Sequence, residues 1–285
     1  MWANIKIEKI KIITDSTSDL VSYVVNKHDI EVLPLLLFFG EESYHDGVDI
    51  SLHSVLEKIR MDEVFPTTSQ VVPQRFYECY KKYLEEGYKI ISIHLSSKMS
   101  GTYQSACMAK DMLETEDIIV IDSLNVTAGL GLLVIKACEL RDQGLAIKEI
   151  EMEILRAIPH VKSALAFETL ENLVKGGRIS KTAGVIGHLL GIKPILAVKD
   201  GEMVVIEKVR GSKKAIKYIL DYSDKIGMKL GELSTLLEVE NKDILNTLRL
   251  NLVEKKIDFI ECQAGCVVGI YAGAGACGIF FIENY

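Results

Sequence analysis

The sequence lacks several features that would place it in a common class of protein. Its six cysteines and six histidines are scattered, without a Cys-x-x-Cys pair or the spacing of metal ligands. Zinc modules and disulfide scaffolds depend on such spacing. We therefore expect that the chain has no metal site and that its cysteines are free thiols in a reducing compartment. No apolar run approaches the roughly 20 residues of a membrane span, and the N-terminus lacks the segments of a signal peptide. We predict a cytoplasmic protein without stable membrane insertion.

The sequence also lacks an excess of positive charge and any phosphate-binding motif. The chain has 33 Lys and Arg against 40 Asp and Glu, a formal net charge of −7. Nucleic-acid binding generally needs a basic stripe, so we predict no nucleic-acid partner. Residues 273–278 match G-x-G-x-x-G, but strand-like residues 279–282 follow where a nucleotide fingerprint requires a helix. We interpret these glycines as a tight turn between strands, and we predict no cofactor.

Three apolar, strand-like runs each end in polar or hydroxyl side chains and lead into a helix. They cover residues 10–14, 90–95 and 118–121. Ligands of open α/β sheets bind beyond the carboxyl ends of the strands. Free backbone N–H groups at helix starts favour anions there. We therefore predict an anion-holding edge on a largely parallel sheet.

The order of elements predicts an α/β protein of two domains with a ligand between them. Residues 1–157 alternate strands and helices, which indicates a mostly parallel sheet with flanking helices. Residues 158–285 indicate an α+β layered domain. The more detailed expectations are a buried strand over 31–39, a polar loop over 66–70, a helix begun by Thr169 and ended by Gly176-Gly177, a helix capped by Ser180, and strands over 258–262, 266–272 and 277–282.

The hydroxyl groups suggest a polar mouth beside an apolar slot. The residues expected to gather at one sheet edge and hydrogen-bond a carboxylate are Thr68, Ser69, Ser96, Ser97 and Ser123. The apolar stretches expected beside them are Leu35–Phe39, Phe167, Leu189, Leu190 and Ile192. Burying an acyl chain contributes about 0.8 kcal/mol per CH₂, so a slot of matching shape can bind a lipid with few polar contacts. The sequence therefore favours a long-chain carboxylic acid as ligand.

A serine-dependent acyl hydrolase is the alternative from a different class. Asp15 and His94 with Ser16, Ser96 or Ser97 would supply its triad, although no G-x-S-x-G elbow is present. Serine and aspartate before helices are more often caps, so we rank this hypothesis second. The loop that contains Asp46 is expected to be a solvated surface.

Several motifs, in order and spacing along nearly the whole chain, are similar to one family. They are residues 12–20 (IITDSTSDL), Thr68-Ser69-Gln70, residues 95–106 (LSSKMSGTYQSA), Ile121-Asp122-Ser123, residues 176–180 (GGRIS), residues 192–196 (IKPIL) and Val209-Arg210-Gly211. With them the sequence resembles the DegV family, the fatty-acid-binding subunits of bacterial fatty acid kinase.

The resemblance implies one fatty acid buried between two α/β domains. It implies that Thr68 and either Ser96 or Ser97 hold the carboxylate, and that Arg178 and Arg210 are family features. It also implies that a separate kinase subunit forms the acyl phosphate, so this chain is a carrier with no catalytic residue of its own.

The chain departs from the family pattern at its C-terminal glycine-rich motif. Tyr271 stands where the family usually has histidine, and Ala274 where it has proline. A phenol can donate a hydrogen bond to a carboxylate, but it does not carry positive charge as imidazolium does. Arg210, Lys213 and Lys214 belong to a basic run that we interpret as a docking surface for the kinase subunit. A lipid-responsive regulator that docks another protein there is the third hypothesis.

Overall fold

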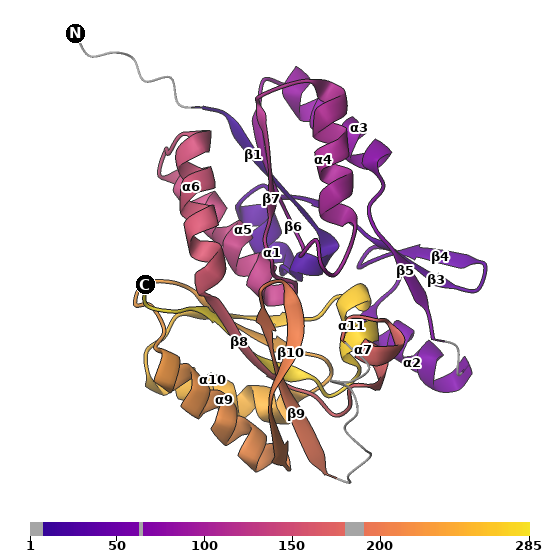
Figure 1. Cartoon of the computed structure of the whole chain (residues 1–285), viewed down its shortest axis with the longest axis vertical. Helices are drawn as coiled ribbons and strands as arrows, with labels where there is room; N and C mark the ends of the chain where they lie inside the picture. Colours follow the sequence, from indigo (N-terminus) through magenta and orange to yellow (C-terminus); the bar gives the residue numbers. More distant parts are fainter. Residues whose placement is uncertain (1–7, 63–64, 180–190) are drawn as a thin grey trace.

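The computed structural model describes residues 8–62, 65–179 and 191–285, and the upper half in Figure 1 is built on a parallel sheet. The strand order is β2-β1-β6-β7, with every neighbouring pair parallel. Helices α3 and α4 pack on one face, and α5 and α6 on the other. The elements are β1 (Ile10–Asp15), η1 (Ser16–Ser18), α1 (Ser22–Lys27), β2 (Glu31–Leu33), α3 (Pro73–Glu85), β6 (Lys89–His94), α4 (Thr102–Leu113), β7 (Ile118–Asp122), α5 (Thr127–Asp142) and α6 (Ile147–Ala157).

The lower half is built on a mixed sheet of six strands in the order β10-β9-β8-β13-β11-β12. Only the pair β11 and β12 is parallel among these neighbours. Helices α9 and α10 cover one face. The elements are η2 (Ile158–His160), β8 (Val161–Ala166), β9 (Ile192–Lys199), β10 (Glu202–Arg210), α9 (Ser212–Ile226), β11 (Ser234–Glu238), α10 (Lys242–Glu254), β12 (Phe259–Gln263) and β13 (Cys277–Ile282).

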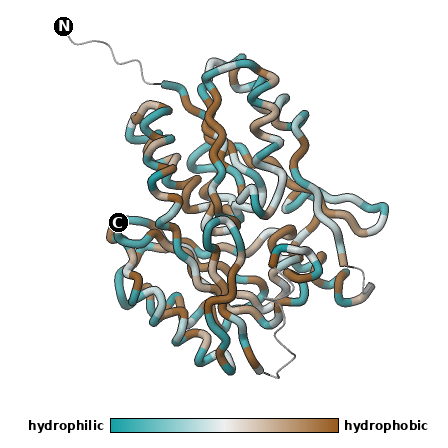
Figure 2. The backbone as a smooth tube through the Cα atoms, in the orientation of Figure 1, coloured by the Kyte–Doolittle hydropathy of each residue, from teal (hydrophilic) through white to brown (hydrophobic). Residues whose placement is uncertain are grey.

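Helix α5 joins the two halves because it packs against both sheets. It contacts β1 and β6 of the parallel sheet and β8, β11 and β13 of the mixed sheet. Eleven of its residues are buried, and they lie on all sides of the helix. A helix that is apolar all round belongs in an interior, which here is the layer between the sheets. Figure 2 shows the same pattern, with apolar stretches along the central strands and hydrophilic segments on the outer helices.

The predicted fold class, α/β with a mostly parallel first half and an α+β second half, is confirmed. The chain passes from the first sheet to the second through η2, and the domain boundary after residue 157 stays a prediction. Helix α6 and strand β8, which flank η2, were not predicted. None of the helices in the described ranges combines the length and apolar character needed to cross a membrane.

Among the described residues, a small antiparallel sheet and three further helices stand beside the two main sheets. The small sheet has the order β4-β3-β5. The elements are β3 (Leu36–Phe39), β4 (Glu42–His45), α2 (Leu52–Asp62), β5 (Thr67–Ser69), α7 (Glu171–Lys175) and α11 (Cys266–Ala272).

The small sheet contains two differences from the predictions. The run 31–39 is not one strand, because it breaks at Pro34-Leu35 into β2 and β3, which belong to different sheets. The polar segment 66–70 is not a loop, because Thr67–Ser69 pairs with β3 as strand β5. Threonine is a good strand former, so the polar composition of this segment was misleading.

The predicted strand over 266–272 is wrong, since these residues form helix α11. The carboxylate of Asp46 accepts hydrogen bonds from the backbone N–H groups of Cys266 and Val267, which begins the helix. Gly273 ends it with φ +73° and donates its N–H to the Gly269 carbonyl. The predicted cap Ser180 lies outside the described residues, as do Leu189 and Leu190 of the predicted apolar slot.

Candidate functional site

A cavity of about 480 Å³, which we call the acyl cavity, lies between the parallel and mixed sheets. Its volume falls within the range of small-molecule sites. Its polar lining residues are Thr17, Thr68, Ser69, Gln70, Ser100, Thr127, Arg178 and Tyr271. Its apolar lining residues include Leu35, Leu95, Met99, Val126, Leu165, Phe167, Leu173, Met203, Leu237, Val267, Val268 and Phe280. Among the described residues that line it, the single full charge is that of Arg178.

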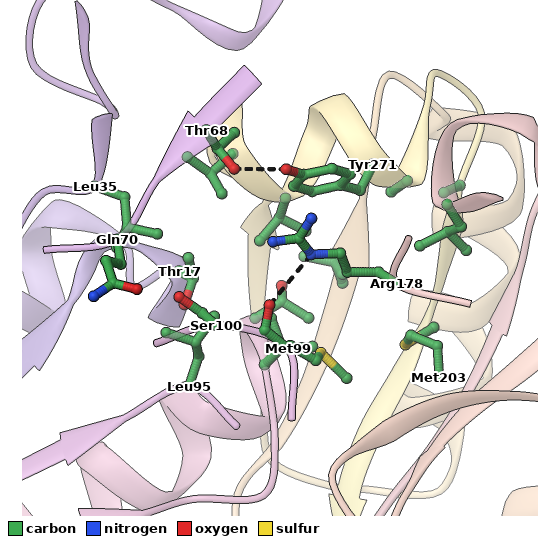
Figure 3. Close-up of a pocket in the computed structure, with 18 of the residues that line it drawn as sticks. Thr17, Leu35, Thr68, Gln70, Leu95, Met99, Ser100, Arg178, Met203 and Tyr271 are labelled. Carbon is green, nitrogen blue, oxygen red and sulfur yellow. Dashed lines mark hydrogen bonds between the residues drawn. The ribbon is translucent and has the colours of Figure 1, made fainter. Parts of the chain in front are cut away.

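Thr68 and Tyr271 form a hydroxyl pair on one wall of the acyl cavity (Figure 3). Thr68 is held by strand pairing, where it lies opposite Leu37 of β3. Tyr271 comes from α11, and its hydroxyl lies 2.5 Å from Oγ1 of Thr68. One hydroxyl of this pair donates to the other, so one hydroxyl hydrogen remains for a ligand. A carboxylate could accept that remaining hydrogen, or accept hydrogen bonds from both groups if it displaced the bond between them.

Arg178 places a guanidinium group beside this pair. Its guanidinium carbon lies 4.8 Å from the centre of the Tyr271 ring, within the range of a cation–π contact. Its Nε donates to the Met99 carbonyl at 3.2 Å, and its Nη1 donates to the Gly176 carbonyl. Within the described parts of the chain, no carboxylate forms an ion pair with Arg178. The charge is therefore oriented by neutral groups and is available to an anion in the cavity.

Two buried carboxyl groups, one beside the parallel sheet and one directly after β4 of the small sheet, fix α11 and so the position of Tyr271. Asp46 Oδ1 accepts the N–H of Cys266 at 2.7 Å, and its Oδ2 accepts the Ser16 hydroxyl at 2.8 Å. Asp19 accepts the N–H of Gly265 at 2.9 Å. Desolvation by burial raises the pKa of Asp46, and it raises the pKa of Asp19 well above its ordinary value. The prediction of a solvated Asp46 is wrong, because it is only 3% exposed.

The structure does not bring Ser96, Ser97 and Ser123 to the acyl cavity. The hydroxyl of Ser96 is buried and donates to the Gly201 carbonyl at 2.7 Å. Ser97 is exposed, and its backbone N–H donates to Asp122. The hydroxyl of Ser123 donates to the Asn125 carbonyl and accepts the Asn125 N–H. Of the seven predicted ligand-binding residues, Thr68, Ser69, Arg178 and Tyr271 line the cavity.

Ser100 is a lining residue that the sequence analysis did not select. It lies at the start of α4, and its hydroxyl is 3.0 Å from the Thr102 hydroxyl. The available signal was the run Ser100-Gly101-Thr102 directly before a helix, a pattern that places a hydroxyl at a helix start.

Asp15 and His94 do belong to a serine–histidine–aspartate chain, but with a different serine from those predicted. His94 Nδ1 lies 3.0 Å from Asp15, and His94 Nε2 lies 2.7 Å from the Ser92 hydroxyl. Ser92 also accepts the Tyr80 hydroxyl at 2.8 Å, and all four residues have no exposed surface. A substrate carbonyl cannot reach Ser92, so this chain of hydrogen bonds is part of the core.

Metal ligation has no basis in the described part of the chain. Over residues 8–62, 65–179 and 191–285, no three His, Cys, Asp or Glu side chains come together as a metal site. The polar groups of the acyl cavity are hydroxyl, amide and guanidinium groups, which suit an organic anion.

Comparison with known proteins assigns the chain to a family. A family model described as an uncharacterised protein of the DegV family matches residues 9–284. A DegV domain-containing protein of Clostridium acetobutylicum is 60% identical over 278 residues, which are 98% of this chain and all of that protein. The structure of a DegV family protein from Thermus thermophilus, described by its fatty acid binding, gives a TM-score of 0.90 at 29% identity. That match covers 97% of this chain and all of the other. DegV of Bacillus subtilis, described as a fatty acid binding protein, gives a TM-score of 0.85 at 29% identity, with the same coverage.

Proposed function

This chain belongs to the DegV family, and on that premise we propose that it binds one long-chain fatty acid in the acyl cavity. The acyl chain lies among the apolar residues, and the carboxylate lies at Thr68, Tyr271 and Arg178. Ser69 and Ser100 line the same cavity and supply further hydroxyl groups. The observation that carries this proposal is an apolar cavity whose one full charge, on Arg178, lacks a carboxylate partner within the described residues and lies beside two hydroxyls.

The energetics of this placement favour a long chain. Each methylene transferred from water contributes about 0.8 kcal/mol, so ten methylenes contribute about 8 kcal/mol before the costs of association. Hydrogen bonds to a charged group contribute about 1.5–3 kcal/mol each. The apolar wall therefore supplies most of the affinity, and the hydroxyl and guanidinium groups fix which end of the ligand lies at the wall of the cavity formed by β5 and α11.

We propose that the protein carries its ligand and does not transform it. The described residues that line the cavity include no His, Asp, Glu, Lys or Cys. The hydroxyls of Thr17 and Thr127 donate to the buried carboxylates of Asp15 and Asp19, but no histidine lines the cavity within the described residues to carry a proton from a serine, as an acyl hydrolase requires. Family membership supports a separate kinase subunit as the catalyst that uses the bound carboxylate.

The docking surface for that subunit is proposed at the end of β10 and the start of α9. Arg210, Lys213 and Lys214 are exposed there, and they form no ion pair with another described residue. Their charge suits an acidic partner surface. If the captured partner in the native cytoplasm is a protein other than a kinase, the regulatory hypothesis replaces this part of the proposal.

The central test is whether the purified protein holds a fatty acid. We expect mass spectrometry of gently purified, denatured protein to show about one equivalent of a long-chain acid. Thr68→Val should raise the Kd for oleic acid by about tenfold to a hundredfold, because it removes one charge-assisted hydrogen bond. Thr67→Val is the matched control, since Thr67 is the exposed neighbour in β5 and does not line the cavity. Protein that is free of lipid and takes up no added acid would contradict the proposal.

A further inference from the structure

The tip of the β9–β10 hairpin, residues 199–202, docks against the parallel-sheet half of the molecule. Gly201 is buried in this tip although Asp200 and Glu202 beside it are exposed. Its carbonyl accepts the Ser96 hydroxyl at 2.7 Å. A Cβ atom on Gly201 would lie 2.5 Å from Ser96 Oγ and 3.1 Å from Leu124 Cδ2. The tip therefore fits closely between two loops that follow strands β6 and β7.

The β9–β10 hairpin separates two cavities close to its tip. Met203 follows the tip and lines the acyl cavity, together with Met99 and Val126 from the opposite half (Figure 3 labels the two methionines). On the other side, Val198 and Asp200 line a second cavity of about 1010 Å³ between α6, η2 and α9. Leu124, which touches the tip, lines this second cavity as well. Moving the tip outward would open the acyl cavity toward the second one.

Few interactions hold the tip in place. Within the described residues, strand β10 pairs only with β9, and its register shifts between Val205 and Glu207. Within the described residues, the Ser96–Gly201 bond is the one hydrogen bond between residues 199–202 and the parallel-sheet half. The Ser96 hydroxyl also accepts the Lys98 N–H at 3.2 Å. Its single hydrogen is thus committed to Gly201 and is not available to a ligand carboxylate.

We propose that Ser96 controls ligand exchange by holding the hairpin tip closed over the acyl cavity, rather than by binding the carboxylate. The inference rests on the proposed fatty acid binding. Exchange of the acyl chain requires the tip to separate from Ser96 and Leu124, and the second cavity receives the chain as it enters or leaves. Ser96 is accordingly a positioning residue. It affects the association and dissociation rates of the ligand, and it does so equally for an acid and for an ester.

The test is a stopped-flow measurement of exchange with a fluorescent conjugated-polyene fatty acid and, in a second series, its methyl ester. Ser96→Ala should raise the association and dissociation rates together by about three- to tenfold, the equivalent of one neutral hydrogen bond. The Kd should stay unchanged, and acid and ester should respond alike. Ser97→Ala is the matched control, because Ser97 is the exposed neighbour outside the cavity. Gly201→Ala displaces the tip by a different route and should also accelerate exchange.

The outcomes separate this inference from the proposed function. If wild-type protein neither contains nor binds a fatty acid, the proposed function fails and the inference falls with it. If wild type binds but Ser96→Ala exchanges at the wild-type rate, the inference alone is overturned. If Ser96→Ala loses affinity for the acid and not for the ester, Ser96 is a carboxylate ligand and the inference is overturned. Thermal unfolding of each variant verifies that the fold is retained.

Discussion

Replacing Gly176 by alanine tests whether the Tyr271 ring must lie directly against the turn after α7. A Cβ atom on residue 176 would lie 2.2 Å from Cε1 of Tyr271, where ordinary contact begins at 3.4 Å. The ring must therefore move by about 3.4 − 2.2 = 1.2 Å. The hydrogen bond between Tyr271 and Thr68 spans 2.5 Å, so a shift of this size is enough to break it. We expect Gly176→Ala to break the hydrogen bond between Thr68 and Tyr271 although neither of these two residues is substituted.

The expected magnitudes follow from two opposing effects at residue 176. Its backbone is αR, where Gly→Ala ordinarily stabilises a protein by about 0.4–1 kcal/mol. Overpacking against a ring costs about 1–3 kcal/mol, which is larger. We expect a net loss of about 1–2 kcal/mol in the free energy of unfolding. Loss of one hydrogen bond to the carboxylate should also raise the Kd for oleic acid by about tenfold or more.

Gly177 provides the matched control in the neighbouring position. It has φ +71°, and a Cβ atom there would meet no other atom within 4 Å. Gly177→Ala should cost about 1–2 kcal/mol of stability through backbone strain alone and leave Tyr271 in place. Urea unfolding and isothermal titration with oleic acid measure both quantities. If the two variants lose stability similarly and both keep wild-type affinity, the argument that Gly176 positions Tyr271 is refuted.

The remaining predictions concern charge. Arg178→Gln should raise the Kd for oleic acid about tenfold or more and leave that for methyl oleate unchanged, as measured by titration, because only the acid carries a charge; equal losses for both ligands would contradict this. Because burial raises the pKa of Asp46, the folded state holds its proton more tightly than the unfolded state. The stability that this provides is complete below about pH 3.9, the ordinary pKa of Asp, and is lost as the pH rises through the folded pKa. Asp46→Asn should therefore reduce the fall in the free energy of unfolding over that pH range, as measured by urea unfolding. A slope identical to wild type would show that Asp46 is not its source.

The parallel half of the fold was predictable because its signals are local. Strands such as β1 and β6 are rich in isoleucine and almost entirely buried, as expected for a sheet covered on both faces. The glycine pair 176–177 marked the end of α7 for an equally local reason. The positions of Thr68 and Tyr271 relative to each other were not local, since they lie 203 residues apart. Their inclusion in one predicted site came from the family resemblance, whereas their hydrogen bond required the structure.

The serines illustrate what strand order alone leaves undetermined. Ser96 and Ser123 follow neighbouring parallel strands, so the prediction that they lie at one sheet edge was sound in topology. The direction of each hydroxyl depends on the partner that its loop meets. Ser96 meets the carbonyl of Gly201 from the mixed sheet, and Ser123 closes on its own loop at Asn125. The partner of Ser96 lies 105 residues away and cannot be identified from the residues around this serine.

Helix α11 shows how distant carboxyl groups can override local propensity and, in doing so, build the site. Its β-branched and aromatic residues favour a strand, but its first N–H groups are held by Asp46 and Asp19 from the other half of the chain. As a helix, it directs Tyr271 toward both Thr68 and Arg178. The phenol supplies a hydrogen bond, and the guanidinium beside its ring supplies the permanent positive charge that a phenol lacks. The cavity therefore combines a hydrogen-bond donor, Tyr271, with a cation, Arg178, and the two aspartates that anchor α11 hold Tyr271 in place.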